Sequence, residues 1–429
     1  MPITTQINRR TTFESYRDCI PEFLQADQPA YNDVPVIPDD LMQAEDWEFD
    51  EADRERLLTT VAGDPLSGYC PSDRQALLAQ EKAAGRLGVL CLAGLDGVIT
   101  DTLRAQQRVA GMVVRTPLVE ANHLLPQTEV RFLLKLEGMQ PIGSYKLRGA
   151  ANTILARGLQ GSGCEVVAMT AGNHGTALAW VCSRVGLRSR LFMPENVAEV
   201  KRAAIIHEGA EVELIGENVT ESAEACDRYV VGTSDAVLVP PYDDPDVITG
   251  QGTMAAEIAQ ELTGDEAPDY IFVPFGGGGA AAGIARFYKS LRPETRIIAV
   301  EPAGSAAMHE SRRAGYRVIL DTVQTVADGV AVKQVGKLNY EISEECVDEC
   351  LVVSELELKQ AIVDHDEAGL RAEGAGALAL AGMRKYLREH PDMRGTAVGI
   401  LSGNRIDEAR LQQIRDELAV SLHTPYMRR

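Results

Sequence analysis

The feature that most constrains this chain is a regular alternation of short strand-like and helix-like segments. Short strand-like segments at residues 165–170, 188–194 and 211–216, two of them with β-branched residues, alternate with segments whose apolar residues recur at helical spacing. A second strand–helix–strand series runs from residue 269 to residue 302. This repetition is typical of α/β proteins with mainly parallel sheets, because two parallel strands need a long crossover between them. The sequence therefore predicts two α/β units, each with an open, mainly parallel sheet.

The chain has 429 residues, which is too long for one ordinary core. Residues 1–92 differ from the rest, because they contain an acidic run at 44–56 and several turn-rich stretches. We expect residues 1–92 to be an N-terminal extension of unknown role. We expect residues 93–165 and 246–429 to form a large domain, and residues 166–245 to form a small α/β domain.

Charge and residue spacing exclude several function classes. Lys and Arg total 42 against 63 Asp and Glu, a formal net charge of -21, so the averaged field repels nucleic acid and anionic membranes. The sequence has neither a secretory signal nor an apolar run long enough to span a membrane, and we expect a cytoplasmic protein. The eight cysteines and seven histidines show no metal-binding spacing, so no metal is predicted.

Lys146 stands between a strand-like segment and a helix-like one. Residues 130–138 have the pattern of a strand, and the residues from about 146 onward are apolar at helical spacing. An amine in the first turn of a helix faces the positive end of the helix dipole, which disfavours its protonated form and favours attack on an aldehyde. A solvated lysine at a helix start explains the same pattern.

A second loop, TAGNHG at residues 170–175, also follows a predicted strand and precedes a helix. Small residues let backbone N–H groups approach an anion, and the start of the helix adds partial positive charge. A carboxylate would suit this loop. The alternative is a plain helix cap by Asn173 with Gly172 as the turn residue.

The third loop is a run of four glycines, Gly276 to Gly279, after an apolar strand. Ordering four glycines costs backbone entropy, so the run indicates positive φ angles or the close approach of a phosphate. A dinucleotide site is an alternative, because Glu301 ends the next predicted strand, but it leaves the other two loops unexplained. A tight structural turn is the other alternative.

Together and in this order, the three loops resemble those of fold-type II pyridoxal-phosphate enzymes, and most of all the threonine deaminase and serine racemase branch. The likeness extends over residues from about 95 to 407. It rests on the three loops and on six further motifs: RTPL at 115–118, YDDPDVITGQGT at 242–253, VEPAGSAAM at 300–308, VADGVAV at 326–332, RAEGAGALALAGM at 371–383 and ILSGN at 400–404.

This resemblance implies that pyridoxal 5'-phosphate is the cofactor, bound by the large domain, and that Lys146 is the catalytic residue that holds it covalently. Asn173 would bind the ring hydroxyl, the glycines the phosphate, and Ser402 would face the ring nitrogen. The implied cofactor contacts are Tyr145, Lys146, Asn173, Gly276, Gly277, Gly278, Gly279, Gly329, Glu373 and Ser402. The implied substrate contacts are Ser144, Thr170, Ala171, Gly172, Asn173 and His174.

The implied reaction is a β-elimination that converts a 3-hydroxy-amino acid such as L-threonine or L-serine to a 2-keto acid and ammonia. A hydroxyl facing the ring nitrogen does not favour a protonated ring, which suits elimination better than transamination. A β-replacement synthase or a specialised lyase on a related amino acid is the alternative, and a non-catalytic protein of the same fold is a third. We expect a small amino-acid substrate and a homodimer or homotetramer.

Three positions depart from that branch. Ala171 stands where serine racemases carry a second acid/base hydroxyl, so racemisation is not expected. Ala307 stands where the branch's cation site has an aspartate, although Glu301 is present. The motif SGNRID has one glycine fewer than the usual SGGN, so Asn404 is not assigned to the site.

Overall fold

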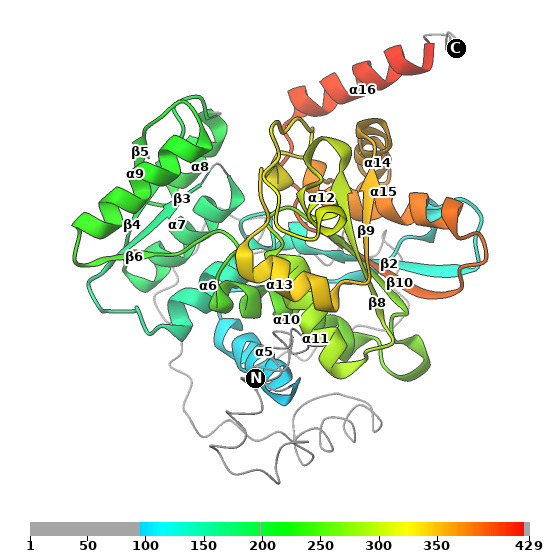
Figure 1. The fold of residues 1–429 in the computed structure, drawn as a ribbon, viewed down its shortest axis with the longest axis horizontal. Coiled ribbons are helices and arrows are strands. Elements are labelled where there is room, and N and C mark those ends of the chain that lie inside the picture. Colours follow the sequence, from blue (N-terminus) through cyan, green and yellow to red (C-terminus); the bar gives the residue numbers. More distant parts are fainter. Residues whose placement is uncertain (1–94, 171, 198, 424–429) are drawn as a thin grey trace, which may run out of the picture.

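The computed structural model describes residues 95–423 except 171 and 198, and in this range the chain forms two open sheets (Figure 1). The larger has the strand order β1-β2-β10-β7-β8-β9, and the smaller the order β5-β4-β3-β6. Among the strands of the described residues, only β1 is antiparallel to its neighbour. The predicted fold class, α/β with two open and mainly parallel sheets, is confirmed. The predicted extension, residues 1–92, lies outside the described residues.

The strands are short, and they coincide with the apolar segments of the sequence. The large sheet consists of β1 (Leu118–Glu120), β2 (Val130–Leu136), β7 (Tyr270–Pro274), β8 (Arg296–Pro302), β9 (Glu349–Val353) and β10 (Gly395–Leu401). The small sheet consists of β3 (Glu165–Met169), β4 (Arg188–Met193), β5 (Glu211–Leu214) and β6 (Ala236–Leu238).

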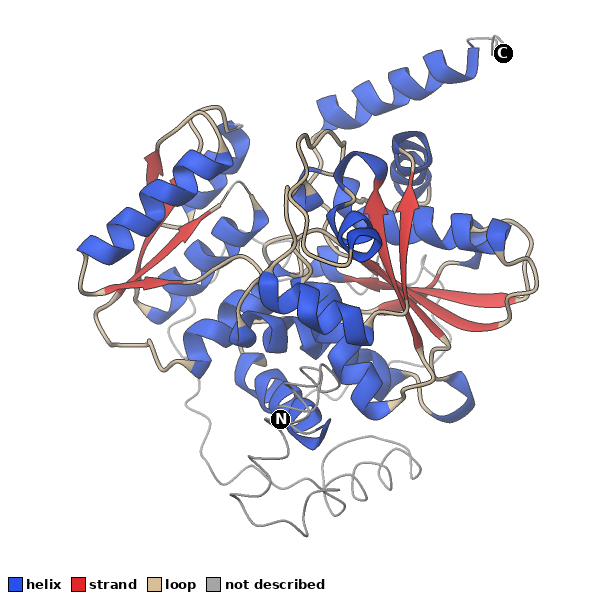
Figure 2. Ribbon diagram, viewed as in Figure 1, coloured by secondary structure: helices blue, strands red, loops and turns tan. Residues whose placement is uncertain are grey.

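Helices cover both faces of the large sheet (Figure 2). Successive residues of a strand point to opposite faces, so Ile298 and Val300 of β8 join one apolar core while Ile297 and Ala299 join the other. The first core is closed by α14 (Glu355–Glu367), α15 (Gly374–Glu389) and α16 (Glu408–His423). The second is closed by α5 (Leu95–Val109), α10 (Pro245–Glu261), α11 (Gly279–Leu291) and α13 (Lys337–Cys346).

The small sheet has its own core. It packs against α7 (Asn173–Val185) on one face and α9 (Val219–Gly232) on the other, with α8 (Glu199–His207) beside α7. Apolar residues of α6 (Lys146–Ala156), among them Leu147 and Ile154, belong to this core. Because α6 also packs along α10, it lies between the small sheet and the large one, and it carries Lys146 at its first position.

The remaining elements are short. They are α12 (Ala307–Ala314) and the 3₁₀ turns η5 (Asn122–Leu124), η6 (Glu137–Met139), η7 (Gly264–Glu266), η8 (Ala303–Ser305) and η9 (Asp328–Val330). None of the helices in the described part of the chain is long and apolar enough to cross a membrane.

Candidate active site

Three of the predicted site loops meet because their strands are neighbours. Strand β10 lies between β2 and β7 and is parallel to both. The carboxyl ends of parallel strands share one edge of a sheet, which is where ligands of such sheets bind. The loop to Lys146 follows β2, Ser402 follows β10, and Gly276 comes soon after β7. The topology therefore brings together residues that are separated by more than a hundred positions in the sequence.

The amine of Lys146 points into this edge. Its Nζ donates a hydrogen bond to the carbonyl oxygen of Pro241 at 2.7 Å, and it lies 5.4 Å and 5.9 Å from the ring centres of Tyr145 and Tyr242. Burial lowers the pKa of Lys146 to about 8, while the carboxylate of Glu373 acts in the opposite direction. An amine with this pKa is neutral in about a tenth of molecules at pH 7, far more than an ordinary lysine, and the neutral form is the one that acts as nucleophile or proton acceptor.

The segment before Lys146 is held by the segment after β10. Tyr145 donates its backbone N–H to the carbonyl of Ser402 at 3.1 Å, and Asn404 donates its own to Gly143 at 3.0 Å. Ser144 and Gly403 form an isolated antiparallel bridge. The predicted contacts Ser144, Tyr145 and Ser402 therefore lie together, and Ser144 and Ser402 are buried.

The TAGNHG loop is organised by its first residue. The Thr170 hydroxyl accepts backbone hydrogen bonds from Gly172 at 3.2 Å and from Gly175 at 3.0 Å. Helix α7 then begins at Asn173. His174 is buried, with Nε2 2.9 Å from the carbonyl of Val239, and burial together with the charge of Lys146 lowers its pKa to about 3. His174 is therefore a neutral imidazole at physiological pH. Ala171 lies outside the described residues.

Glu373 contacts this loop and acts on the lysine through its charge. It is 6% exposed, and its Oε1 accepts a hydrogen bond of 2.9 Å from Nδ2 of Asn173. Burial, reinforced by the charge of Asp328, raises its pKa to about 7. A Cβ on Gly329 would lie 3.3 Å from the same carboxylate oxygen, and one on Gly403 would lie 2.7 Å from it. The carboxylate therefore packs closely against these two glycines, where a larger residue would not fit without a shift.

The glycine run lies between the start of α11 and the aromatic ring of Tyr242. A Cβ on Gly277 would lie 2.3 Å from that ring, so only glycine fits there. Gly278 has φ +96°, a left-handed conformation that favours glycine, and it caps α11. The Asn339 amide donates to the carbonyls of Gly277 at 2.7 Å and Tyr242 at 3.1 Å, which holds the glycine run against the segment of Tyr242.

These residues fit a cofactor that has an aldehyde and a phosphate. The first backbone N–H groups of α11 have no partner within the helix, and they are the usual donors to a phosphate at such a position. Tyr242 links this cradle to the amine, because its ring faces both Gly277 and Lys146. The lysine and the glycine run are thus two ends of one site.

Several residues of this site were not predicted from the sequence. Tyr242 begins the motif at 242–253 and Pro241 precedes it, but sequence analysis assigned neither residue a role. The available signal was Asp244, the N-cap residue of α10, which marks this segment as the loop before a helix. The sequence gives no local indication of the role of Asn339, because its contacts depend on how α13 packs. Lys201 of α8 and Asp328 of η9 form an ion pair. This pair joins a helix beside the small sheet to a turn beside the large sheet, and Lys201 lies next to the TAGNHG loop.

Glu301 has a structural role here. Both of its carboxylate oxygens accept backbone hydrogen bonds, from Met308 and from His309, each at 2.8 Å, so the side chain caps α12. A dinucleotide site would require this carboxylate to bind a ribose, and its oxygens already have backbone donors. The structure therefore favours the phosphate cradle over the dinucleotide alternative.

Comparison with known proteins agrees with this geometry. The family model for pyridoxal-phosphate dependent enzymes matches residues 109–403. The chain is 35% identical over 321 residues to the catabolic L-threonine dehydratase TdcB of Escherichia coli, covering 75% of this chain and 96% of that one. It is 36% identical over 306 residues to the biosynthetic L-threonine dehydratase IlvA of Pasteurella multocida, covering 71% and 59%.

Solved structures give the same result. The processed form of threonine deaminase isoform 2 from Solanum lycopersicum has a TM-score of 0.71 and 33% identity, covering 76% of this chain and 88% of that one. Maize serine racemase has a TM-score of 0.69 and 27% identity, covering 76% and 99%. The chain therefore belongs to the pyridoxal-phosphate dependent enzymes of fold-type II, in the threonine deaminase and serine racemase branch.

Proposed function

We propose that this chain is a pyridoxal-phosphate dependent dehydratase that converts L-threonine or L-serine to a 2-keto acid and ammonia. The observation that carries the proposal is the placement of a partly buried amine of lowered pKa, Lys146, beside an aromatic ring that also packs on the glycine cradle. The relatives named as L-threonine dehydratases support the reaction.

The site residues would have separate roles toward the cofactor. When bound, pyridoxal phosphate supplies an aldehyde for an amine and a conjugated ring that withdraws electrons from the α carbon. Lys146 would hold it covalently and, once released by the substrate amine, would remove the α proton. The glycine cradle would bind the phosphate, and Ser402 at the end of β10 would face the ring nitrogen with a hydroxyl, which suits elimination.

Helix α7 supplies the binding site for the substrate carboxylate. Its first N–H groups and its dipole favour an anion at Asn173. Two cations add to this field, because Arg405 donates to Thr176 in the first turn at 3.3 Å, and Nζ of Lys201 lies 4.0 Å from an ideal Cβ on Gly172. The proposed substrate contacts are Ser144, Thr170, Ala171, Gly172, Asn173 and His174.

The proposed domain division follows the two sheets. The strands of the small sheet run from residue 165 to residue 238, which supports a small domain at 166–245, and the large sheet supports a cofactor domain at 93–165 and 246–429. We further propose that the protein is cytoplasmic and forms a homodimer or homotetramer. Light scattering on purified protein tests the oligomeric state.

The proposed reaction is tested by incubating purified protein with a panel of 3-hydroxy-amino acids. We expect equal amounts of ammonia and 2-keto acid from L-threonine or L-serine, because each substrate molecule yields one molecule of each product. If no member of the panel gives keto acid, the dehydratase proposal is wrong. If an added thiol is instead incorporated and little keto acid forms, the protein is a β-replacement synthase.

We predict that Glu373→Gln changes the pH dependence of cofactor uptake. The Glu373 carboxylate raises the pKa of Lys146 against the lowering effect of burial, so neutralising it moves the pKa of Lys146 below about 8. Glutamine still accepts the hydrogen bond of Asn173. The rate of cofactor uptake by the protein stripped of cofactor, measured from pH 6 to 9, should have a lower midpoint in the variant. An unchanged midpoint contradicts this role.

The same variant should alter stability in a defined pH range. Burial raises the pKa of Glu373 from 4.5 to about 7, so the folded protein favours the neutral carboxyl. Its contribution to stability is fully present below pH 4.5 and is lost as the pH rises through about 7. The Tm of Glu373→Gln relative to wild type should therefore increase between pH 5 and pH 8. A Tm difference that is constant over this range would contradict the buried neutral state.

A further inference from the structure

The first turn of α6 contains a second charged residue that the proposed chemistry does not use. Arg148 follows Lys146 by two positions and is fully buried. Its Nε and Nη2 both donate to the carboxylate of Glu137, at 2.8 Å each, and its Nη1 and Nη2 donate to the two oxygens of Glu257, at 2.6 and 2.8 Å. Nη1 also donates to the Thr253 hydroxyl at 3.1 Å. Such a doubly bidentate arrangement uses the rigid fork of a guanidinium.

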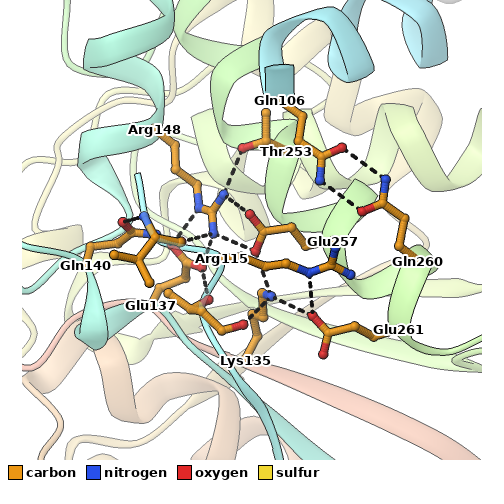
Figure 3. A network of polar contacts seen from close by, with 12 residues as sticks. Gln106, Arg115, Lys135, Glu137, Gln140, Arg148, Thr253, Glu257, Gln260 and Glu261 are labelled. Atoms are coloured by element: carbon orange, nitrogen blue, oxygen red, sulfur yellow. Dashed lines mark hydrogen bonds and ion pairs between the residues drawn. The ribbon is translucent and has the colours of Figure 1, made fainter. Parts of the chain in front are cut away.

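Figure 3 shows that this arrangement joins three elements. Glu137 follows β2, Arg148 belongs to α6, and Glu257 belongs to α10. Lys135, buried on β2, binds Glu257 at 2.7 Å and the carbonyl of Thr116 at 2.7 Å. The four fully buried charges, two positive and two negative, balance. We name the residues Lys135, Glu137, Arg148, Thr253 and Glu257 the Arg148 network.

Close backbone packing continues from this network to the glycine cradle. A Cβ on Gly250 of α10 would lie 2.7 Å from the carbonyl oxygen of Arg148 and 2.8 Å from Cα of Gly149, so α6 and α10 touch through their backbones. A Cβ on Gly283 of α11 would lie 2.7 Å from the backbone nitrogen of Gly252. The three helices α6, α10 and α11 therefore form one closely packed stack.

The two outer helices of this stack begin at the two ends of the cofactor site. Helix α6 begins at Lys146, and α11 begins at Gly279. The apolar side of α6 belongs to the core of the small sheet, whereas the Arg148 network joins α6 to α10 and to the large sheet. A shift of the small sheet would move Lys146 relative to the glycines unless α6 is fixed at its first turn.

We infer that Arg148 is a positioning residue that fixes the Lys146 amine relative to the phosphate cradle of the proposed dehydratase. The guanidinium touches neither the lysine amine nor the glycines. It acts by holding the first turn of α6 on α10, and hence at a set distance from α11. A displacement of about 1 Å at a reacting group lowers a rate by about 100-fold.

Arg148→Lys is the main test. Lysine keeps a cation beside the two buried carboxylates, but it cannot bind both in a bidentate manner. We expect folded protein that takes up pyridoxal phosphate, with kcat on the proposed substrate about 10- to 100-fold lower, little change in KM, and slower borohydride trapping of the cofactor on Lys146. The pH midpoint of the visible band should also shift, which a purely structural role would not produce.

Arg157→Lys is the matched control. Arg157 caps the other end of α6 and also pairs with acids at the start of α10, Asp244 and Asp246, but it is partly exposed and three turns from Lys146. We expect its trapping rate, band midpoint and kcat to stay within about twofold of wild type, because this partly exposed ion pair lies away from the Lys146 end of the helix.

Thr253→Val tests the positioning role of Arg148 if the Arg148→Lys protein does not fold. It removes the hydroxyl that accepts a hydrogen bond from Nη1 and donates one to the carbonyl of Gly250, with little change of shape. We expect a severalfold slower trapping rate. The inference is wrong if every folded variant, Thr253→Val included, has the trapping rate and band midpoint of the wild type. A lower Tm in such variants would then reflect only a structural role. Trapping and the visible band need no substrate, so they separate this inference from failure of the proposed reaction.

Discussion

Replacing Lys146 by alanine should abolish turnover and the covalent cofactor together. The variant lacks both the amine that would hold the aldehyde and the base that would take the α proton. General base catalysis alone contributes about 10²- to 10⁴-fold, so we expect kcat to fall by at least about 10³-fold. The visible band of the covalent linkage should be missing from the spectrum of the purified variant, while its circular dichroism matches wild type.

Lys359→Ala is a suitable control for that variant. Lys359 lies on α14, is not among the predicted site residues, and pairs with Glu417 of α16. Loss of a single surface ion pair changes stability by about 0–1 kcal/mol, and turnover should not change. A Lys146→Ala protein that retained wild-type activity would show that another group holds the cofactor.

Gly277→Ala should produce the second largest effect, on cofactor affinity. The new Cβ would lie 2.3 Å from the Tyr242 ring, so either the ring or the glycine run must move. Because Tyr242 also faces the Lys146 amine, such a movement disturbs both ends of the site. We expect the dissociation constant of pyridoxal phosphate, measured by equilibrium dialysis, to rise by about 100-fold, equivalent to roughly 3 kcal/mol.

Gly111→Ala provides the comparison. Gly111 follows α5, has no positive φ, and an added Cβ there meets nothing within 4 Å. Its cofactor affinity should equal that of wild type. Equal affinities for Gly277→Ala and Gly111→Ala would mean that the glycine run is a structural turn and not a phosphate cradle.

The fold could be predicted from the sequence to a large extent because its signals are local. Strand β3 and helix α7, or β7 and α11, are each specified by an apolar run, a glycine-containing loop and helical spacing within about twenty residues. Parallel pairing then places the loops at one edge of each sheet. The loops of Lys146, Thr170 and Gly276 could therefore be recognised without knowledge of their contacts.

The interactions that tune the site were not predictable in this way. Asn173 and Glu373 are 200 positions apart, and Arg148 and Glu257 are 109 apart, yet each pair is in hydrogen-bond contact. Nothing local to Arg148 shows that its guanidinium is buried between two carboxylates. The pKa of Glu373 likewise depends on burial by segments distant in the sequence. Long-range packing, and not local propensity, determines these contacts.

The central claim is that Lys146 carries pyridoxal phosphate, and mass spectrometry of the borohydride-reduced, proteolysed protein tests it most directly. We predict one phosphopyridoxyl group per chain, on the peptide that contains Lys146. A purified protein that takes up no cofactor, or that is labelled on a different lysine, would contradict the claim.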